Sequence, residues 1–309
     1  MEDHHPKKIL LAVDGSDPAL DALRYVGRMS SFRKMKIVLF HVFSSVPESY
    51  RDLEKDPRFS KVAKEVMDWE AQQKKVIQKY MDKAKEILIS LGFSDGAVTV
   101  KVQNRKKGVA RDIIAEALNG YEAVVLGRKG YGNLKEIIIG SVAKKVVEKN
   151  AFLPVLLIGK LPPDEKILLP IDQSENAMRA VDFVGETLGG FEFKITLFHV
   201  IRGRLSSDLP HLFLPKERLE EAEKEIDAVF KKAIRHLRGA GFKPEQLTTK
   251  VVTEIDSRAA SIIQEARDFD YRTIIIGRKG VTKVREFFMG RVSNKVISTI
   301  RDRTIWVIT

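Results

Sequence analysis

The chain has 309 residues, the length of about two domains, and its composition of 44% hydrophobic and 31% charged residues excludes a disordered polymer. It has no cysteine, so disulfides, thiolate catalysis and cysteine-bound metals are excluded, and no apolar run approaches the ~18–20 residues that cross a bilayer. The formal net charge of +12 permits nucleic-acid binding, but Lys and Arg alternate with acidic residues along the predicted helices, as on ordinary exposed faces.

The first predicted elements alternate between strand and helix. Residues 8–13 form a continuous apolar run, as expected of a strand that is buried on both faces. A helix follows over 17–29, for which we predict Asp17 as the N-cap and Pro18 as the first helical residue. Further strands are predicted at 35–42, 97–102, 123–127 and 154–159, and further helices at 109–118 and 141–149.

A long amphipathic helix is predicted between the second and third strands. Its apolar residues recur at spacings of three, four and seven, which is the pattern of one buried helix face, and Gly92 ends it. The predicted buried face consists of Val62, Val66, Trp69, Val76, Tyr80, Ala84 and Ile87.

The second half of the chain repeats the first, and a repeat of this length indicates a duplicated domain. We predict one domain over 1–160 and a second over 164–309, joined by a proline-marked linker at 159–165. The first half carries extra residues before its glycine-rich loop, and we predict that they lie at 44–60. The matching segments are 7–26 with 165–184, 37–43 with 195–201, and 123–130 with 274–280.

This order of elements predicts the fold class. Alternating strands and helices imply a parallel sheet covered by helices on both faces, and right-handed crossovers make such a sheet doubly wound. We therefore predict an α/β protein with two Rossmann-like or flavodoxin-like doubly wound five-stranded parallel sheets in tandem.

A ligand-binding crevice is expected at one edge of each sheet. In such folds ligands bind beyond the carboxyl ends of the strands, at the switch point where the strand order reverses. For a five-stranded order of this kind the switch point lies between the first and fourth strands. Asp14 ends the first strand and Gly127 the fourth, so we expect them to face each other, with Val42 at the same edge. A carboxylate such as Asp14 can accept hydrogen bonds from ribose hydroxyls or an adenine amino group.

Glycines with one spacing occur at this edge in both halves. The first stretch contains Gly127, Gly130 and Gly140, and Ser141 follows at a predicted helix start. Glycine lets backbone N–H groups approach an anion closely, and a helix start favours phosphate. The pattern is neither a Walker A loop nor a GxGxxG motif. The alternative explanation is that these glycines only permit tight turns and close packing.

The chain resembles a tandem universal stress protein over both halves. Residues 127–141 match that family's nucleotide-binding signature, G-x2-G-x9-G-[ST], and 13–20 and 40–42 match its first two strands. The resemblance implies that the first half binds ATP, and Mg²⁺ or Mn²⁺ is expected to accompany the phosphates. It also implies pairing of the two domains through their last strands within one chain; a homodimer is a further expectation. The residues implied to hold ATP are Asp14, Val42, Leu126, Gly127, Gly130, Gly140, Ser141, Val142 and Ala143.

The second half departs from the signature at its last residue, where Arg291 stands in place of Ser or Thr. An arginine here can donate to phosphate, or it can fill the pocket by pairing with an acid. The loop after the third strand is basic in the first half (104–108) but contains Glu254 and Asp256 in the second, so an altered nucleotide site and an empty site both stay open. The corresponding residues are Asp172, Val200, Gly277, Gly280, Gly290, Arg291 and Ser293.

The sequence favours an ATP-binding regulatory module of the stress response, with at most slow ATP hydrolysis, in which nucleotide occupancy changes partner binding. No catalytic or metal-binding residue is predicted, and His41 and His199 are interpreted as packed or hydrogen-bonded. The alternatives are an ATP-hydrolysing or adenylyl-transfer enzyme, and a basic nucleic-acid or protein interaction module without nucleotide. A cytoplasmic location is expected because the N-terminus lacks a signal-peptide pattern.

Overall fold

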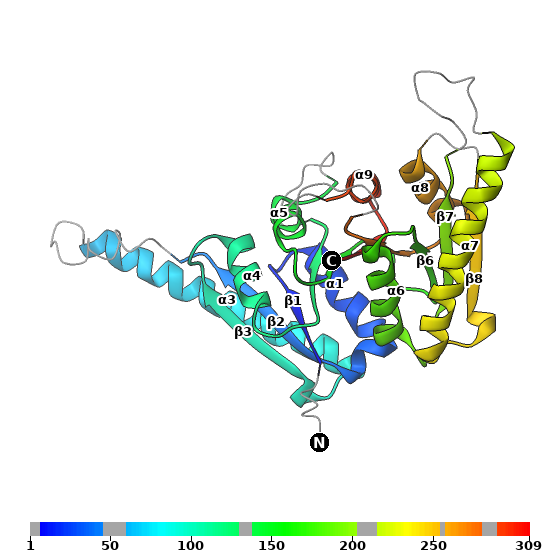
Figure 1. Ribbon diagram of the computed structural model, residues 1–309. Coiled ribbons are helices and arrows are strands. Elements are labelled where there is room, and N and C mark those ends of the chain that lie inside the picture. Colours follow the sequence, from blue (N-terminus) through cyan, green and yellow to red (C-terminus); the bar gives the residue numbers. More distant parts are fainter. Residues whose placement is uncertain (1–6, 46–59, 130–137, 203–214, 254–256, 280–288) are drawn as a thin grey trace.

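The computed structural model describes residues 7–45, 60–129, 138–202, 215–253, 257–279 and 289–309. These residues form a ten-stranded sheet with helices on both faces, in the strand order β3-β2-β1-β4-β5-β10-β9-β6-β7-β8 (Figure 1). Each half of the chain contributes five adjacent parallel strands, so the predicted tandem α/β fold is confirmed. Among the described helices, none is both long and apolar enough to cross a membrane.

The first half begins and ends with short buried strands. Its strands are β1 (Lys8–Ala12), β2 (Lys36–Phe43), β3 (Val98–Asn104), β4 (Ala123–Gly127) and β5 (Val155–Ile158). Its helices are α1 (Asp17–Arg28), α3 (Ser60–Ser90), α4 (Val109–Ala117) and α5 (Ser141–Lys149), with short 3-10 turns η1 (Ser30–Lys34) and η3 (Asp95–Ala97).

The second half repeats this order. Its strands are β6 (Lys166–Pro170), β7 (Lys194–Val200), β8 (Leu247–Val252), β9 (Thr273–Gly277) and β10 (Thr304–Ile308). Its helices are α6 (Glu175–Leu188), α7 (Lys216–Gly239), α8 (Arg258–Asp268) and α9 (Arg291–Thr299), with one 3-10 turn, η4 (Pro244–Gln246). In each half the first strand lies between the second and the fourth, so the switch point falls where it was predicted.

Strands β5 and β10 pair antiparallel at the centre of the sheet and join the two halves, with Trp306 opposite Leu156. The Trp306 side chain is fully buried, stacks on Phe32 of the first half at 5.7 Å between ring centroids, and meets Phe183 of α6 edge-on at 5.9 Å. Residues of both halves therefore pack in the same hydrophobic cores at this pair of strands.

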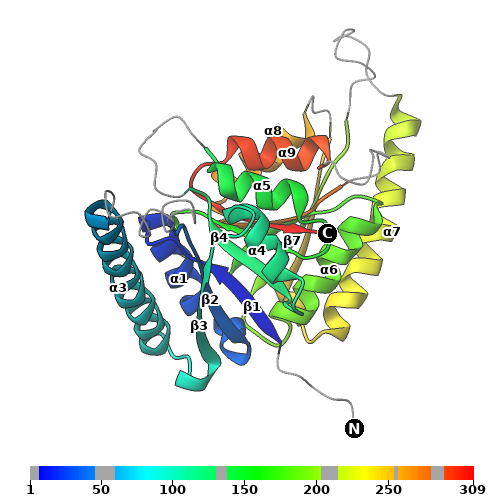
Figure 2. The ribbon, with the colours of Figure 1, turned by 90° about the vertical axis from the view of Figure 1, so that its left-hand side faces the viewer.

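Each face of the sheet is covered by helices from both halves. Helices α1, α3, α6 and α7 pack on one face, and α4, α5, α8 and α9 pack on the other. The strand residues alternate between the two cores, as Leu10 and Leu11 do, which explains why the strand sequences are apolar throughout. Helices α5 and α9 lie beside each other over the centre of the sheet (Figures 1 and 2).

Helix α1 begins differently from the prediction. Its N-cap is Ser16, and Asp17 is the first helical residue, with Pro18 still in the first turn. The cause is the side chain of Asp14, whose Oδ1 accepts hydrogen bonds from the Ser16 N–H at 3.0 Å and the Ser16 hydroxyl at 2.6 Å. These bonds turn the chain immediately after β1, so the helix starts one residue earlier.

The predicted buried face of the long helix α3 is wrong in its first half. The side chains of Val62, Trp69 and Val76 are 48%, 53% and 55% exposed, whereas Met81, Ala84 and Leu88 are fully buried. Helix α3 has 31 residues and its counterpart α7 has 24, while the preceding segments 44–59 and 201–215 are nearly equal in length. Most of the extra length therefore lies in the helix, whose first turns extend beyond the edge of the sheet (Figure 1).

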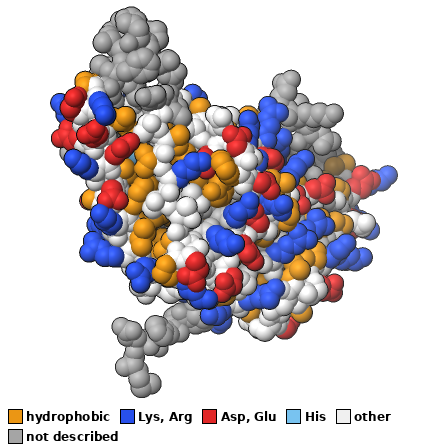
Figure 3. Space-filling view, turned by 90° about the vertical axis from the view of Figure 1, so that its right-hand side faces the viewer, with side chains coloured by type: hydrophobic (Ala, Val, Ile, Leu, Met, Phe, Trp, Pro, Cys, Tyr) orange, Lys and Arg blue, Asp and Glu red, His pale blue; other side chains and the backbone are white. Residues whose placement is uncertain are grey.

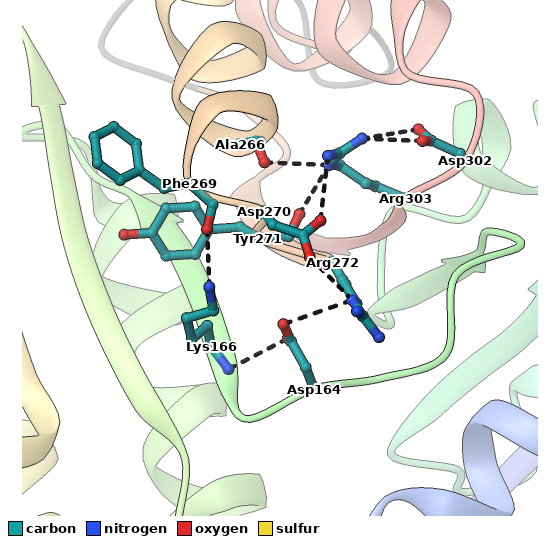
Figure 4. A network of polar contacts seen from close by, with 9 residues as sticks. All are labelled: Asp164, Lys166, Ala266, Phe269, Asp270, Tyr271, Arg272, Asp302 and Arg303. Atoms are coloured by element: carbon teal, nitrogen blue, oxygen red, sulfur yellow. Dashed lines mark hydrogen bonds and ion pairs between the residues drawn. The ribbon is translucent and has the colours of Figure 1, made fainter.

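The linker between the halves is fixed by charged side chains (Figure 4). Arg272 lies 3.8 Å from the Asp164 carboxylate and 3.4 Å from Asp270, and Lys166 Nζ donates to the Phe269 carbonyl at 2.9 Å. Arg303, which follows α9, lies 3.6 Å from the second oxygen of Asp270. The end of the linker is thus held against the loop between α8 and β9.

The positive net charge is not gathered into one patch on the face shown in Figure 3. There Lys and Arg side chains lie among Asp and Glu side chains and apolar residues. Several helical pairs alternate in sign, such as Lys231 with Asp227 at 2.6 Å and Arg218 with Glu221 at 3.4 Å. This is the surface pattern of ordinary exposed helices.

Candidate functional site

A cavity of about 400 Å³ lies at the carboxyl ends of β1, β2 and β4, and we call it the first pocket. It brings together every predicted residue of the first site except Gly130, which is outside the described residues. Its walls are Ala12, Val13, Asp14, Phe40, His41, Val42, Val109, Ile113, Leu126, Gly127, Lys129, Gly140, Ser141, Val142 and Ala143.

Asp14 supplies a carboxylate oxygen that the described residues leave unused. Its Oδ1 holds the backbone and hydroxyl of Ser16, and its Oδ2 has no hydrogen bond among the described residues. Beside it, His41 Nδ1 donates to the Val13 carbonyl at 2.8 Å, because a carbonyl can only accept. His41 is therefore hydrogen-bonded, as predicted, and it ties the end of β2 to the end of β1.

The opposite wall is the start of helix α5. Gly140 is its N-cap, and the Gly140 N–H donates to the Arg128 carbonyl at 2.6 Å, which closes the base of the glycine-rich loop. The first helical hydrogen bond runs from the Lys144 N–H to the Gly140 carbonyl. The N–H groups of Ser141, Val142 and Ala143 therefore have no acceptor within the helix. Three such donors at the positive end of a helix dipole are of the kind that favours an anion.

The glycines that end β4 and β9 are required for close packing. A Cβ on Gly127 would lie 2.5 Å from the carbonyl oxygen of Pro18, and a Cβ on Gly277 would lie 2.9 Å from that of Asn176. Neither glycine has a positive φ. Close packing, the alternative explanation from the sequence, therefore accounts for these two positions.

Sequence reasoning missed part of the apolar wall. Val109 and Ile113, on the first turns of α4, close the pocket opposite Leu126, and Phe40 lies beside them. The signal was available, because α4 follows the third strand and so starts at the same sheet edge. Lys129, which also lines the pocket, lies inside the glycine-rich stretch but was not assigned a role.

The equivalent cavity in the second half, the second pocket, measures only about 140 Å³. The predicted residues Asp172, Val200, Gly277, Gly290, Arg291 and Ser293 all line it. Gly280, Glu254 and Asp256 are outside the described residues. The remaining walls come from Pro170, Ile171, Ser174, Ala177, Phe198, His199, Arg258, Ile262, Ile276, Lys279 and Val292.

The loops after the third strands predicted a basic first site and an acidic second site. The charged side chains that line the two pockets do not follow this contrast. Within the described lining of the first pocket Lys129 and Asp14 carry the charges, and residues 105–107 are not part of that lining. The backbone N–H groups of that loop instead bind the Asp112 carboxylate at 2.8 and 3.0 Å. The described lining of the second pocket has three cations, from Arg258, Lys279 and Arg291, and Asp172 as its carboxylate.

Two further polar groups shape the second pocket. The Ser293 hydroxyl donates to the Gly277 carbonyl at 2.7 Å, and so joins α9 to the end of β9. His199 Nδ1 donates to the Ile171 carbonyl at 2.7 Å, as predicted for a hydrogen-bonded histidine. Burial is the main cause that lowers the pKa of His199; the hydrogen bond to the Ile171 carbonyl opposes it, the positive charge of Arg258 adds to it, and Asp172 has a smaller opposing effect. At neutral pH the imidazole is therefore uncharged.

Two buried arginines, Arg128 and Arg278, connect each pocket to the other half, and we call them the crossed arginines. Arg128 follows β4 and donates to the Ile297 and Ile300 carbonyls at the end of α9, the latter at 2.7 Å. Arg278 follows β9 and donates to three carbonyls at the end of α5, those of Val147, Glu148 and Asn150, at 2.6 to 2.7 Å. Each guanidinium thus caps the carboxyl end of a helix in the other half of the chain. The amino end of that same helix lines the pocket of the other half.

The crossed arginines remain cationic although they are buried. Burial lowers the pKa of Arg128 to about 10, and Asp302 partly offsets this effect. Burial also lowers the pKa of Arg278. A cation at the carboxyl end of a helix is stabilised by the helix dipole as well as by the unpaired carbonyls. No sequence pattern indicates this role, because the two arginines look like further basic residues of a phosphate loop.

The fold and the two pockets define a class: a duplicated doubly wound α/β protein with a pocket and a helix start at each switch point. The sequence model of the Universal stress protein family matches residues 5–159 and again 165–301. The chain therefore belongs to the universal stress protein family, with two family domains in tandem.

Three relatives illustrate the likeness. The chain is 27% identical to universal stress protein MJ0577 of Methanocaldococcus jannaschii over 166 residues, 50% of this chain and 95% of that protein. It is 24% identical to a universal stress protein of Mycolicibacterium smegmatis over 299 residues, 93% and 92% of the two chains. The crystal structure of a universal stress protein from Archaeoglobus fulgidus shares its fold with a TM-score of 0.66 at 17% identity, over 99% of each chain.

Proposed function

We propose that this universal stress protein binds ATP in the first pocket and acts as a nucleotide-dependent regulatory module. The observation that carries the proposal is the joint lining of one cavity by Asp14, by the glycine-rich loop and by the start of α5. The cavity volume of about 400 Å³ falls within the range of roughly 300–1,000 Å³ that is usual for small-molecule sites.

The chemistry of the walls suits the three parts of ATP. The apolar side chains of Val42, Ile113 and Leu126 offer a surface for the adenine ring. Asp14 Oδ2 is an acceptor for ribose hydroxyls or the adenine amino group. The N–H groups of residues 141–143, the Ser141 hydroxyl and Lys129 are donors for the phosphates.

A divalent cation would be held mainly by the phosphates and water. Among the described residues no group of three His, Asp or Glu side chains is arranged to hold a metal ion. Mg²⁺ commonly retains several water ligands when it binds with nucleotide phosphates. We therefore propose Mg²⁺ or Mn²⁺ as a companion of ATP, with no dedicated protein cage.

The first test is to identify what the protein carries. Mass spectrometry of small molecules released from the denatured, purified chain should detect adenine nucleotide, and calorimetry should give one ATP per chain. Gly140→Val and Asp14→Ala should each weaken ATP binding about tenfold or more, because each change removes or blocks hydrogen bonds to a charged or polar ligand group.

Matched changes in the second half control for structural damage. Asp172 also binds the backbone of the residue two positions on, Ser174, at 3.0 Å, so Asp172→Ala removes the same kind of turn contact as Asp14→Ala. Asp172→Ala and Gly290→Val should leave ATP binding unchanged. If the Gly140→Val protein bound ATP as tightly as the wild type, the assignment of the first pocket would be wrong.

The regulatory part of the proposal has its own measurement. ATP should be hydrolysed at most slowly during prolonged incubation with Mg²⁺, and turnover well above background that one carboxylate change abolishes would instead establish an enzyme. A cytoplasmic location and a homodimer remain predictions, for which cell fractionation and sedimentation analysis are the measurements.

A further inference from the structure

The second pocket differs from the first at two positions that both begin a helix. Helix α4 starts at Val109 and helix α8 at Arg258, while α5 starts at Ser141 and α9 at Arg291. An apolar side chain and a hydroxyl in the first half are therefore replaced by two guanidinium groups in the second. Both arginines line the second pocket, together with Lys279.

These two arginines occupy unfavourable positions in the protein alone. The first turn of a helix carries the positive end of its dipole, so a cation there is destabilising and an anion is stabilising. Among the described residues, neither Arg258 nor Arg291 has an ion pair or a hydrogen bond from its side chain, and Lys279 has none either. The three cations and two helix starts all border one cavity, where a bound anion would be stabilised by the cations and by the helix dipoles together.

The size of the cavity limits that anion. At about 140 Å³ the second pocket is well below the roughly 300 Å³ at which small-molecule sites usually begin. Ser293 stands where the first half has Ala143, and its hydroxyl is already bound to the Gly277 carbonyl, so it narrows the cavity. A base and ribose would have to share this volume with the phosphates.

We propose that the second pocket binds a compact phosphate anion of the pyrophosphate class, held by Arg258, Arg291 and Lys279, and does not bind intact ATP. Guanidinium groups bind two phosphate oxygens at once, and a pyrophosphate offers oxygens to two such groups from a small volume. This proposal is independent of ATP binding in the first pocket, since it involves only residues of the second half.

The experiment is calorimetry of the full chain with pyrophosphate, with orthophosphate and sulfate at equal ionic strength as comparison anions. Wild-type protein should bind one pyrophosphate and should bind sulfate much more weakly. The double variant Arg258→Val and Arg291→Ser, which restores the first-half residues, should weaken pyrophosphate binding by about tenfold or more for each arginine. Arg235→Val, a change of an exposed arginine on α7, should leave binding unchanged.

Further arms separate the two pockets. Gly140→Val and Asp14→Ala should retain pyrophosphate binding; loss in both would place pyrophosphate in the first pocket and overturn the proposal. Equal binding of sulfate, or wild-type affinity in the Arg258 and Arg291 double variant, would also overturn it. If two ATP molecules bound per chain and the double variant bound one, the second pocket would be a nucleotide site and the assigned ligand class would be wrong.

Discussion

The two pockets occupy equivalent places in the duplicated fold but differ in volume and in charge. The first has about 400 Å³, and Lys129 and Asp14 are its charged lining residues; the second has about 140 Å³ and a described lining with three cations. The main differences are side chains at the starts of helices, Val109 and Ser141 against Arg258 and Arg291. A doubly wound fold can therefore change the chemistry of its switch point without any change in strand order.

The comparison also shows what is common to the two halves. The backbone supplies the loop closure in both, through the Gly140 N–H to Arg128 and the Gly290 N–H to Arg278, at 2.6 and 2.9 Å. The side chains of Ser141, Arg258 and Arg291 are exposed and that of Val109 is half-buried, so these positions lie at the margin of the core. Positions that pack against backbone, such as Gly127 and Gly277, stay glycine in both copies.

The largest expected effect is the loss of stability when one of the crossed arginines is replaced. Arg278→Met should lower the free energy of unfolding by about 3 kcal/mol or more, because three carbonyls lose a charged donor. Arg128→Met removes bonds to two carbonyls and should cost somewhat less. Urea denaturation measures both, with the exposed Arg235→Met as the control. Wild-type stability in either variant would show that the caps contribute little.

A smaller effect should distinguish the two strand-ending glycines. Gly127→Ala should destabilise the fold by about 2 kcal/mol, since its Cβ would lie 2.5 Å from the Pro18 carbonyl oxygen. Gly277→Ala should cost about 1 kcal/mol, because its nearest contact would be 2.9 Å. Gly96→Ala, where nothing lies within 4 Å, is the matched control. The reverse order of the two costs would contradict the packing explanation.

The smallest expected effect is the pH dependence of stability that His199, in the second pocket, contributes. Burial lowers the folded-state pKa of His199, so as the pH falls the unfolded chain takes up this proton before the folded chain does. Stability should therefore fall as the pH decreases through the unfolded histidine pKa of about 6.5, and His199→Gln should reduce that slope. Denaturation curves between about pH 7.5 and 5.5, roughly the range in which histidine titrates, measure this slope. Identical slopes in wild type and variant would exclude a contribution from His199.

Much of the architecture could be predicted from the sequence, because its signals are local and repeated. The apolar runs gave the strands almost to the residue, and the predicted bounds of β4 and α5 agree with the structure. The switch point followed from the order of elements alone, and it brought Asp14 and Gly127 to one cavity as expected.

The failures share a physical cause: they depend on what an element meets in three dimensions. The apolar period of α3 continues past the edge of the sheet, so Val62 and Trp69 have the spacing of core residues and yet are exposed. The charge of the second pocket was judged from Glu254 and Asp256, whereas Arg258, at the start of α8, lines the cavity. Nor does periodicity reveal that Arg128 reaches a helix more than a hundred residues away.

The crossed arginines have a consequence for how this chain can change. Each half contains both an arginine that donates hydrogen bonds and a helix end whose carbonyls accept them. The two halves therefore cap each other's helices. A substitution at 128 is therefore constrained by α9, and one at 278 by α5. Either half cut out at the linker would retain an arginine without its carbonyls and a helix without its cap, with the edge of its central strand unpaired. The two domains are separate in sequence, but each supplies hydrogen bonds and a strand partner to the other.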